Sequence, residues 1–265
     1  MAKNNIEKTI KDIKDIKIQG AKAIAIAGIG ILKQVHKEHG FGDEFDSICA
    51  RLESVRPTAV PLHNAIELIK KRKDPVAFDE LIYFFDETKE KIAAHAQIII
   101  KEGSTILTHC HSSEVVAAFK MAKNAGKSFR VIVTETRPRM QGKITAKELL
   151  DAGIEVTYIV DSAASSFLDE TNAVIMGTDA IRKEGIYNKI GSYMIALAAK
   201  KKGVPVYILG DTLKIDKRRS IKIEERPGNE VVDKRTLRGV DVKNPTFDMT
   251  PWNLIDAVIT ERGKY

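Results

Sequence analysis

The feature that most limits the possible folds is a change of rhythm near residue 104. From that point on, short apolar runs alternate with amphipathic segments. The apolar runs lie at 105–109, 129–135, 154–160, 173–177 and 204–209, and helices are predicted between them at 112–125, 145–152 and 189–202, with a short helix after 160. Strand–helix repetition of this kind predicts a parallel, doubly wound sheet that helices cover on both faces. The run at 256–263 is a candidate last strand.

The start of one of these helices has a sequence signal of its own. Thr145-Ala146-Lys147-Glu148 has the form of a capping box, in which a threonine and a glutamate satisfy the first free N–H groups of a helix. The sequence therefore predicts that this helix begins at Thr145.

The first hundred residues follow a helical pattern instead. Ile6, Ile10, Ile13 and Ile16 recur at the three- and four-residue spacing of an amphipathic helix. The segment 56–61 contains two prolines and interrupts the pattern, because proline fixes φ and restricts the residue before it. We therefore expect a helical N-terminal domain at 1–102 and an α/β domain at 103–265.

The charge of the chain allows two kinds of partner. Lys and Arg exceed Asp and Glu by 43 − 36 = +7, which favours either nucleic acid or a small phosphorylated substrate. Aromatic residues make up 6% of the chain and do not interleave with the basic ones, as a base-stacking surface requires. We therefore expect no nucleic-acid partner. No segment is apolar enough to act as a signal peptide or to cross a membrane, so no membrane partner is expected either.

The two cysteines, Cys49 and Cys110, are 61 residues apart. They do not form a disulfide framework, and four ligands for a structural zinc ion are not visible. This usage is typical of a reducing, cytoplasmic setting. Cys49 lies in an ordinary helical pattern and is interpreted as a core residue.

Polar residues with reactive side chains follow each predicted strand. In doubly wound sheets, ligands bind outside the carboxyl ends of the strands, so these residues predict a binding site. Each of them alone also fits a turn, a helix cap or, for the cysteine, a buried apolar position. The groups are 109–113, 135–138, 161–162, 177–179 and 210–214.

The same strand ends carry a family resemblance. The segments THCHSS (108–113), VTETRPRMQGKITAKEL (133–149), VIMGTDAI (174–181) and NKIGSYMIALAAK (188–200) resemble a superfamily with three branches. These are methylthioribose-1-phosphate isomerase, archaeal ribose-1,5-bisphosphate isomerase and the regulatory subunits of eukaryotic initiation factor 2B. The wording of the motifs is most similar to the archaeal isomerase branch. The resemblance implies a Rossmann-like C-terminal domain and a homo-oligomer, either a dimer or a multiple of dimers.

The resemblance also implies functional residues. One cysteine and one aspartate do the chemistry in the isomerase branches, and they fall on Cys110 and Asp179. The neighbouring residues suit these roles, because a thiolate forms most easily near a helix N-terminus and near positive charge, here from His109 and His111. Burial after an apolar strand would keep Asp179 protonated. The implied substrate-binding residues are Gly20, Ala21, Lys22, Arg56, Ser112, Ser113, Glu135, Arg137, Gln141, Asn188, Lys189 and Lys214.

The implied reaction converts α-D-ribose 1,5-bisphosphate into D-ribulose 1,5-bisphosphate in AMP and nucleoside salvage. We expect Cys110 to act as the base and Asp179 as the acid, through a phosphoenolate. A hydride shift from carbon 2 to carbon 1 is the mechanistic rival. An isomerisation without net redox change needs no cofactor, and no metal is expected.

Two other functions remain open at this point. A methylthioribose-1-phosphate isomerase would use the same chemistry, and an initiation-factor-2B-like regulatory subunit would bind a ligand without catalysis. Gln19 stands where the family usually has an arginine, which removes a planar cation from the expected phosphate loop unless Lys22 replaces it. The sequence ends at Tyr265, where similar sequences continue, and a shorter tail would alter subunit packing.

Overall fold

The computed structural model describes residues 2–15, 17–18, 20–220, 223–233 and 235–265. The chain divides into two compact units. Unit 1 comprises Met1–Glu87 and Leu213–Lys222, and unit 2 comprises Thr88–Thr212 and Ile223–Tyr265. The predicted boundary between a domain at 1–102 and a domain at 103–265 was drawn from the change in sequence pattern, and it stays a prediction.

Unit 1 is helical, as the isoleucine spacing predicts. Its helices are α1 (Ala2–Lys14), α2 (Ala21–His39), α3 (Asp43–Val55), α4 (Val60–Arg72) and the first part of α5 (Val76–Ala96). They bury a single apolar cluster that includes Ile13, Leu32, Phe45 and Phe78. Cys49 is completely buried in this cluster, so its interpretation as a core residue is confirmed.

Unit 2 is built on a sheet of seven strands in the order β10-β9-β7-β4-β1-β2-β3. All neighbouring strands are parallel except β10 and β9. The bounds are β1 (Thr105–Thr108), β2 (Arg130–Thr134), β3 (Glu155–Ile159), β4 (Ala173–Gly177), β7 (Val206–Leu209), β9 (Ala257–Thr260) and β10 (Gly263–Lys264). The strand order therefore reverses between β1 and β4, which is the topological switch point of a doubly wound sheet.

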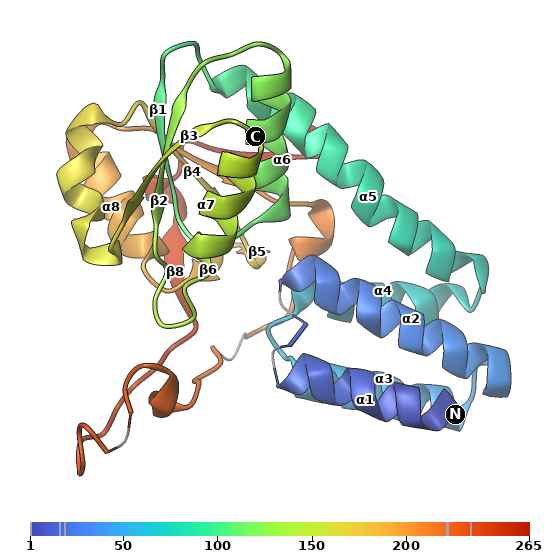
Figure 1. The fold of residues 1–265 in the computed structure, drawn as a ribbon. Coiled ribbons are helices and arrows are strands. Elements are labelled where there is room, and N and C mark those ends of the chain that lie inside the picture. Colours follow the sequence, from blue (N-terminus) through green and yellow to red (C-terminus); the bar gives the residue numbers. More distant parts are fainter. Residues whose placement is uncertain (1, 16, 19, 221–222, 234) are drawn as a thin grey trace. The chain divides into compact units, whose positions relative to one another are not determined.

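Helices cover both faces of this sheet, which confirms the predicted fold class. On one face, α6 (Ser113–Asn124), α7 (Gly142–Asp151) and the end of α5 pack on strand residues such as Ile106 and Ile175. On the other face, α8 (Ser192–Lys202) and a 3₁₀ segment (Asp161–Glu170) pack on Leu107 and Met176, the residues that follow Ile106 and Ile175 in the sequence. Figure 1 shows α8 on one side of the strands and α6 and α7 on the other. Successive strand residues thus point to opposite cores, as strand geometry requires.

A second, smaller sheet in unit 2 was not predicted. It consists of β5 (Ala180–Arg182), β6 (Gly185–Lys189) and β8 (Phe247–Pro251), which pair antiparallel. The predicted helix at 189–202 therefore begins three residues late, at Ser192, because Gly185–Lys189 pairs with β8. Further short 3₁₀ segments lie at Gln97–Ile99, Thr212–Lys214, Gly228–Glu230 and Trp252–Leu254.

The predicted start of α7 is wrong. The helix begins at Gly142 rather than at Thr145, and no side chain caps it. A Cβ atom on Gly142 would lie 1.8 Å from the carbonyl oxygen of Thr134, so only glycine allows the helix to approach the end of β2 this closely. The hydroxyl of Thr145 is therefore available for another partner.

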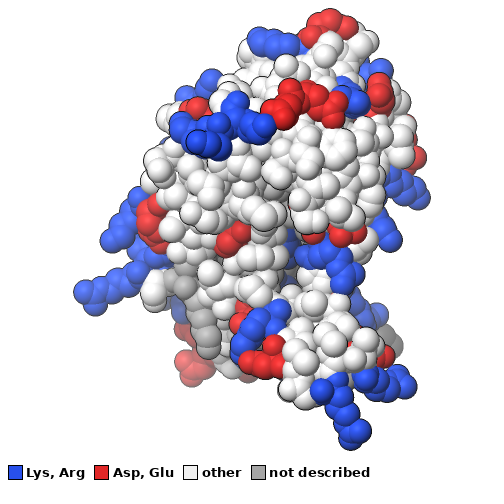
Figure 2. Space-filling view, turned by 90° about the vertical axis from the view of Figure 1, so that its left-hand side faces the viewer, with Lys and Arg blue, Asp and Glu red and all other residues white. Residues whose placement is uncertain are grey.

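The charges on one face of the molecule are dispersed. On the face that Figure 2 shows, Lys and Arg side chains are scattered among Asp and Glu, and a broad area carries neither. No helix in the described part of the chain is long and apolar enough to cross a membrane.

Candidate active site

The fold brings the predicted catalytic pair to the switch point. Cys110 follows β1 and Asp179 follows β4, and these two strands are neighbours in the sheet. Because parallel strands end at the same edge, both residues lie at the carboxyl edge, where ligands bind in such sheets. Asp179 also donates its backbone N–H to the carbonyl oxygen of Tyr187 at 2.9 Å, which ties it to β6.

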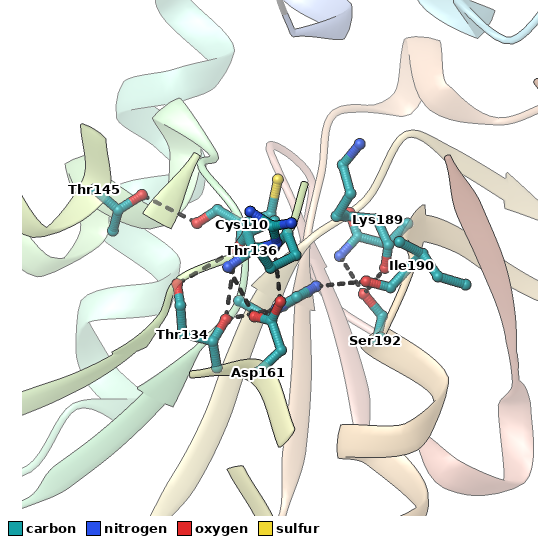
Figure 3. A network of polar contacts seen from close by, with 12 residues as sticks. Cys110, Thr134, Thr136, Thr145, Asp161, Lys189, Ile190 and Ser192 are labelled. Atoms are coloured by element: carbon teal, nitrogen blue, oxygen red, sulfur yellow. Dashed lines mark hydrogen bonds and ion pairs between the residues drawn. The ribbon is translucent and has the colours of Figure 1, made fainter. Parts of the chain in front are cut away.

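Cys110 has an unusual backbone conformation. Its φ is +69°, in the left-handed region that non-glycine residues rarely adopt. Its N–H donates to Thr136 Oγ1 at 2.9 Å, and its carbonyl oxygen accepts from Thr145 Oγ1 at 3.0 Å. Figure 3 shows its sulfur pointing away from this network, to the same side as the amine of Lys189. The two threonines therefore hold the peptide groups of Cys110 while its thiol stays outside the network.

Asp161 lies beneath the loop that contains Thr136. Its Oδ1 accepts the N–H of Thr136 and its Oδ2 accepts the N–H of Arg137, each at 2.7 Å. Asp161 follows β3, so residues after β1, β2 and β3 are joined by hydrogen bonds (Figure 3).

The two histidines beside Cys110 are neutral at neutral pH. Burial lowers the pKa of His109 and of His111. His109 Nε2 lies 2.9 Å from the carbonyl oxygen of Ile190 and must carry the proton, so Nδ1 accepts from Thr134 Oγ1 at 2.6 Å. The expectation that the histidines provide positive charge for the thiol is therefore corrected: His109 is buried, His111 is half-buried, and both are hydrogen-bonded and uncharged.

Positive charge near the thiol comes from Lys189 instead. The pKa of Cys110 is raised to about 11, chiefly by burial; Lys189 lowers this pKa, and the carboxylates of Asp179 and Asp161 raise it. These electrostatic effects connect Cys110, Asp179 and Lys189, which come from three different segments after β1, after β4 and at the end of β6. In the ligand-free state the thiol form predominates at neutral pH.

The turn after β6 is held by hydrogen bonds within unit 2. Ser192 Oγ accepts from Asn188 Nδ2 at 2.8 Å and donates to the carbonyl oxygen of Lys189 at 2.7 Å. Asp248 on β8 accepts the N–H groups of Gly191 at 2.7 Å and Tyr193 at 3.1 Å. Asn188 and Lys189 are both buried, so the turn presents them in a fixed arrangement.

Ser112 and Ser113 begin α6, as predicted. Ser112 is the N-cap residue, and its Oγ accepts the N–H of Val115 at 3.4 Å. Both hydroxyls donate to Oε2 of the buried Glu114, at 2.8 Å and 3.2 Å. A carboxylate is favourable at a helix N-terminus, so Glu114 competes there with any bound anion.

The predicted residues of the second motif have separate environments. Glu135 extends the β2–β3 ladder through its N–H, which donates to the carbonyl oxygen of Ile159 at 2.8 Å. Arg137 is exposed, and its Nη2 donates to the carbonyl oxygen of Val231 at 2.8 Å. Gln141 is half-buried and precedes α7.

The remaining predicted binding residues belong to unit 1, namely Gly20, Ala21, Lys22, Arg56 and Lys214. Gly20 and Ala21 form the start of α2, which suits an anion because helix N-termini offer free N–H groups. Lys22 Nζ donates to Asp86 Oδ1 and to the carbonyl oxygen of Phe85, both at 2.9 Å. Gln19 lies outside the described residues.

Lys214 joins unit 1 through its own segment. Asn64 Nδ2 of α4 donates to the carbonyl oxygens of Leu213 at 2.6 Å and Ile215 at 2.9 Å. Arg218 Nη1 donates to the carbonyl oxygen of Pro57 at 2.9 Å, next to Arg56. Two buried basic residues from distant parts of the sequence, Arg56 and Lys214, thus belong to the same unit.

Thr136 and Asp161 lie in the strand-end groups that predicted a binding site, although no individual role was assigned to them, whereas Thr134, Thr145 and Asp248 were not predicted as site residues. Thr134, Thr136 and Thr145 supply the hydroxyl groups around Cys110, and Asp161 and Asp248 hold backbone N–H groups. A signal existed for Asp161, because it directly follows a predicted strand. Asp248 had none, since the sheet that contains it was not predicted.

The chain is similar to known proteins along most of its length. The Initiation factor 2 subunit family matches residues 17–265. A ribose 1,5-bisphosphate isomerase of Archaeoglobus fulgidus is 39% identical, over 95% of this chain and 86% of the relative. A methylthioribose-1-phosphate isomerase 1 of Pseudothermotoga lettingae is 35% identical, over 95% of this chain and 84% of the relative. The solved structure of the translation initiation factor eIF-2B of Pyrococcus horikoshii OT3 has a TM-score of 0.86 and 29% identity, over 98% of this chain and 96% of that one.

Proposed function

This chain belongs to the Initiation factor 2 subunit family, and we propose that it is the isomerase that converts α-D-ribose 1,5-bisphosphate into D-ribulose 1,5-bisphosphate. The observation that carries the proposal is the presence of Cys110 and Asp179 at the switch point, with Lys189 acting on the same thiol. A cysteine, a carboxyl group and an ammonium group at one ligand-binding edge suit acid–base chemistry on an anionic sugar.

The proposed reaction begins with Cys110 as a thiolate and Asp179 as a carboxylic acid. The thiolate removes the proton from carbon 2, and the electron pair of that bond forms the double bond between carbons 1 and 2. The bond between carbon 1 and the ring oxygen breaks, and the ring oxygen receives the proton of Asp179. The thiol then returns its proton to carbon 1, while the Asp179 carboxylate takes the proton of the 2-hydroxyl. Both residues return to their starting states, so no electrons are gained or lost overall.

The raised pKa of Cys110 limits the fraction of enzyme that is ready to react. With a pKa of about 11, a thiol is ionised to ~0.03% at pH 7.5. Lys189 opposes this effect, because its ammonium group favours the thiolate. The raised pKa of Cys110 favours a second assignment, because a thiol that stays protonated can act as an acid. In this assignment the thiol of Cys110 protonates the ring oxygen, Asp179 takes the proton of the 2-hydroxyl, and hydride moves from carbon 2 to carbon 1.

The two phosphates are assigned to the basic and helix-terminal residues. On the basis of family resemblance, we include the start of α2 at Gly20 and Ala21, together with Arg56 and Lys214, among the residues proposed to bind phosphate. In unit 2 we assign Asn188 and Lys189, with Ser112 and Ser113 at the start of α6. Lys22, Glu135, Arg137 and Gln141 remain proposed members of the binding site on the basis of family resemblance. A thioether sugar lacks the second phosphate and would leave part of this charge without a partner.

The test is an isomerase assay on the purified protein with two substrates, α-D-ribose 1,5-bisphosphate and methylthioribose 1-phosphate. We expect turnover of the bisphosphate alone, and a loss of at least about a hundredfold in Cys110→Ser and in Asp179→Asn. Cys49→Ala is the matched control, because it removes the other cysteine from the core of unit 1. Turnover of the thioether sugar instead would assign the chain to the methylthioribose pathway.

A regulatory subunit without catalysis predicts a different result. Folded protein that turns over neither substrate, but still binds a phosphorylated ligand, would support that function and refute the isomerase proposal. Equal activity in Cys110→Ser and wild type would refute the assignment of the cysteine, even if the protein is an isomerase.

We further propose that the protein works as a homo-oligomer, a dimer or a multiple of dimers, in the cytoplasm. Exposed apolar side chains on α8, namely Tyr193, Met194 and Leu197, support a contact with a second copy. Analytical ultracentrifugation of wild type and of Met194→Glu tests this, and a wild-type monomer at micromolar concentration would refute it. The product would enter AMP and nucleoside salvage through a carboxylase of ribulose bisphosphate.

A further inference from the structure

We propose that Thr136 and Asp161 are positioning residues for this reaction, which hold Cys110 in the left-handed conformation that presents its thiol at the edge of the sheet. The inference rests on the proposed function, because it concerns the group that we assign to proton transfer. Neither residue is placed in contact with the reacting atoms. Thr136 acts through the backbone of Cys110, and Asp161 acts through the backbone of Thr136.

The conformation of Cys110 needs an external restraint. A non-glycine residue in the left-handed region is disfavoured by about 1–2 kcal/mol. The N–H and carbonyl groups of Cys110 are both bound by hydroxyl groups from other segments, Thr136 Oγ1 at 2.9 Å and Thr145 Oγ1 at 3.0 Å. Both threonines are buried, so water does not replace either bond readily.

Thr136 is restrained in the same way. It also has a positive φ, +60°, which is a larger departure for a β-branched residue. The carboxylate of Asp161 accepts two consecutive N–H groups, those of Thr136 and Arg137, and thereby fixes the peptide that joins them. A restraint thus passes from the end of β3 to the end of β2 and from there to Cys110.

The hydroxyl of Thr136 has a role that an apolar side chain of the same shape lacks. Its oxygen accepts from Cys110 N–H and it donates to the carbonyl oxygen of Thr134 at 3.3 Å. Valine fills the same volume but leaves the N–H of Cys110 without this acceptor, whereas serine keeps the acceptor. Thr136→Val and Thr136→Ser therefore form a matched pair.

Releasing Cys110 should affect catalysis more than binding. A misplacement of about 1 Å at a reacting group costs on the order of a hundredfold in rate. Asn188 and Lys189, which we assign to the phosphates, have no hydrogen bond to Thr136 in the described part of the chain. The expected signature is a fall in kcat with KM nearly unchanged.

The thiol itself gives a second readout that does not need the substrate. Burial raises the pKa of Cys110. If the loop is released, the thiol gains access to water, its pKa falls toward the ordinary value, and it reacts faster with iodoacetamide at pH 8. Cys49 is completely buried and should stay protected, so it reports on whether the fold is intact.

The experiment compares wild type, Thr136→Val, Thr136→Ser and Asp161→Asn, with Thr171→Val as control. Thr171 is a buried threonine whose hydroxyl donates to the carbonyl oxygen of Phe167. It lies just before the start of β4, at the end of the strand that is opposite to the proposed active site. We expect Thr136→Val to lower kcat by about 10- to 100-fold, with KM changed by less than about twofold, and to speed alkylation of Cys110 at least about tenfold. Thr136→Ser and Thr171→Val should resemble wild type, and Asp161→Asn should change in the direction of Thr136→Val.

Three results would overturn the proposal. They are equal impairment of Thr136→Ser and Thr136→Val, an unchanged kcat in Thr136→Val, or alkylation of Cys49 together with Cys110, which would indicate general unfolding. If Thr136→Val does not fold, Asp161→Asn is used for the test. The asparagine oxygen can still accept one of the two N–H groups, so this variant weakens the restraint and is more readily folded. If wild type lacks isomerase activity, the proposed function fails, and alkylation of Cys110 still decides whether Thr136 holds it.

Discussion

A methyl group at Gly177 should disturb the loop that begins α6. Gly177 is the last residue of β4, and a Cβ atom there would lie 2.7 Å from Ser112 Cβ and 2.8 Å from Ser112 Oγ. Carbon atoms pack at about 3.5 Å or more, so Ser112 must move by roughly 0.8 Å. Rotation of the serine side chain does not relieve the contact, because the position of Cβ is set by the backbone.

The energetic effect can be bounded from this contact. Overpacking of a buried site by one methyl group destabilises a protein by about 1–3 kcal/mol. At ~2–4 °C per kcal/mol for a chain of this size, Gly177→Ala should lower the Tm by about 2–12 °C. Ser112→Gly removes both clashing atoms, and glycine is nearly as good as serine at an N-cap, within a few tenths of a kcal/mol.

The assay is calorimetry on wild type, the two single variants and the double variant. The double variant should regain at least about 1 kcal/mol relative to Gly177→Ala, since residues in direct contact show couplings of this size. Stability is the appropriate readout, because Ser112 is also assigned to substrate binding. A double variant that melts no higher than Gly177→Ala would refute the reasoning, and so would a Gly177→Ala variant that is as stable as wild type.

Three further predictions follow from single features. If Cys110 is the base, kcat/KM should rise with pH toward its pKa of about 11 and solvent deuterium should enter carbon 1, whereas a fall at that pH without deuterium would assign the thiol as the acid. Burial raises the pKa of Asp248 to about 6 from 3.8, so the folded state binds this proton more tightly than the unfolded state does. The corresponding contribution to the free energy of unfolding is present below pH 3.8 and is lost as the pH rises through 6, and it amounts to at most about (6 − 3.8) × 1.36 ≈ 3 kcal/mol. Denaturant titrations of Asp248→Asn at several pH values should lack this pH dependence. In α2, Gly28→Ala should lower the Tm because its Cβ would lie 2.4 Å from Leu62 Cδ1, and Gly30→Ala should raise it by removing an exposed helical glycine with open space around it.

The large sheet was predictable because its strands are buried on both faces. Such strands appear as short continuous apolar runs, and the run at 173–177 coincides with β4 from end to end. Cys110 and Asp179 directly follow two of these predicted strands, and ligands bind at the carboxyl ends of strands in such sheets. The general rule therefore placed both residues in the candidate site. The family resemblance added the roles of these residues.

The small sheet and the network beneath Cys110 were not predictable in the same way. Gly185–Lys189 has no continuous apolar run, and it becomes a strand because it pairs with β8, a segment about 62 residues later in the sequence. The antiparallel pairing runs from Lys189 opposite Phe247 to Gly185 opposite Pro251. The capping-box pattern at Thr145 was misleading, since the close approach of Gly142 to β2 moves the helix start and assigns the threonine hydroxyl to Cys110. Likewise, adjacency in the sequence does not reveal that burial makes both histidines neutral.

The discontinuous composition of unit 1 has a consequence for protein engineering. Leu213–Lys222 belongs to unit 1, while the chain before and after it belongs to unit 2. A recombinant fragment cut at residue 88 would carry this segment without α4 and Asn64, to which it is hydrogen-bonded. A chimaera that exchanges unit 1 with that of a relative therefore needs two grafts, one of them a short internal piece that includes Lys214.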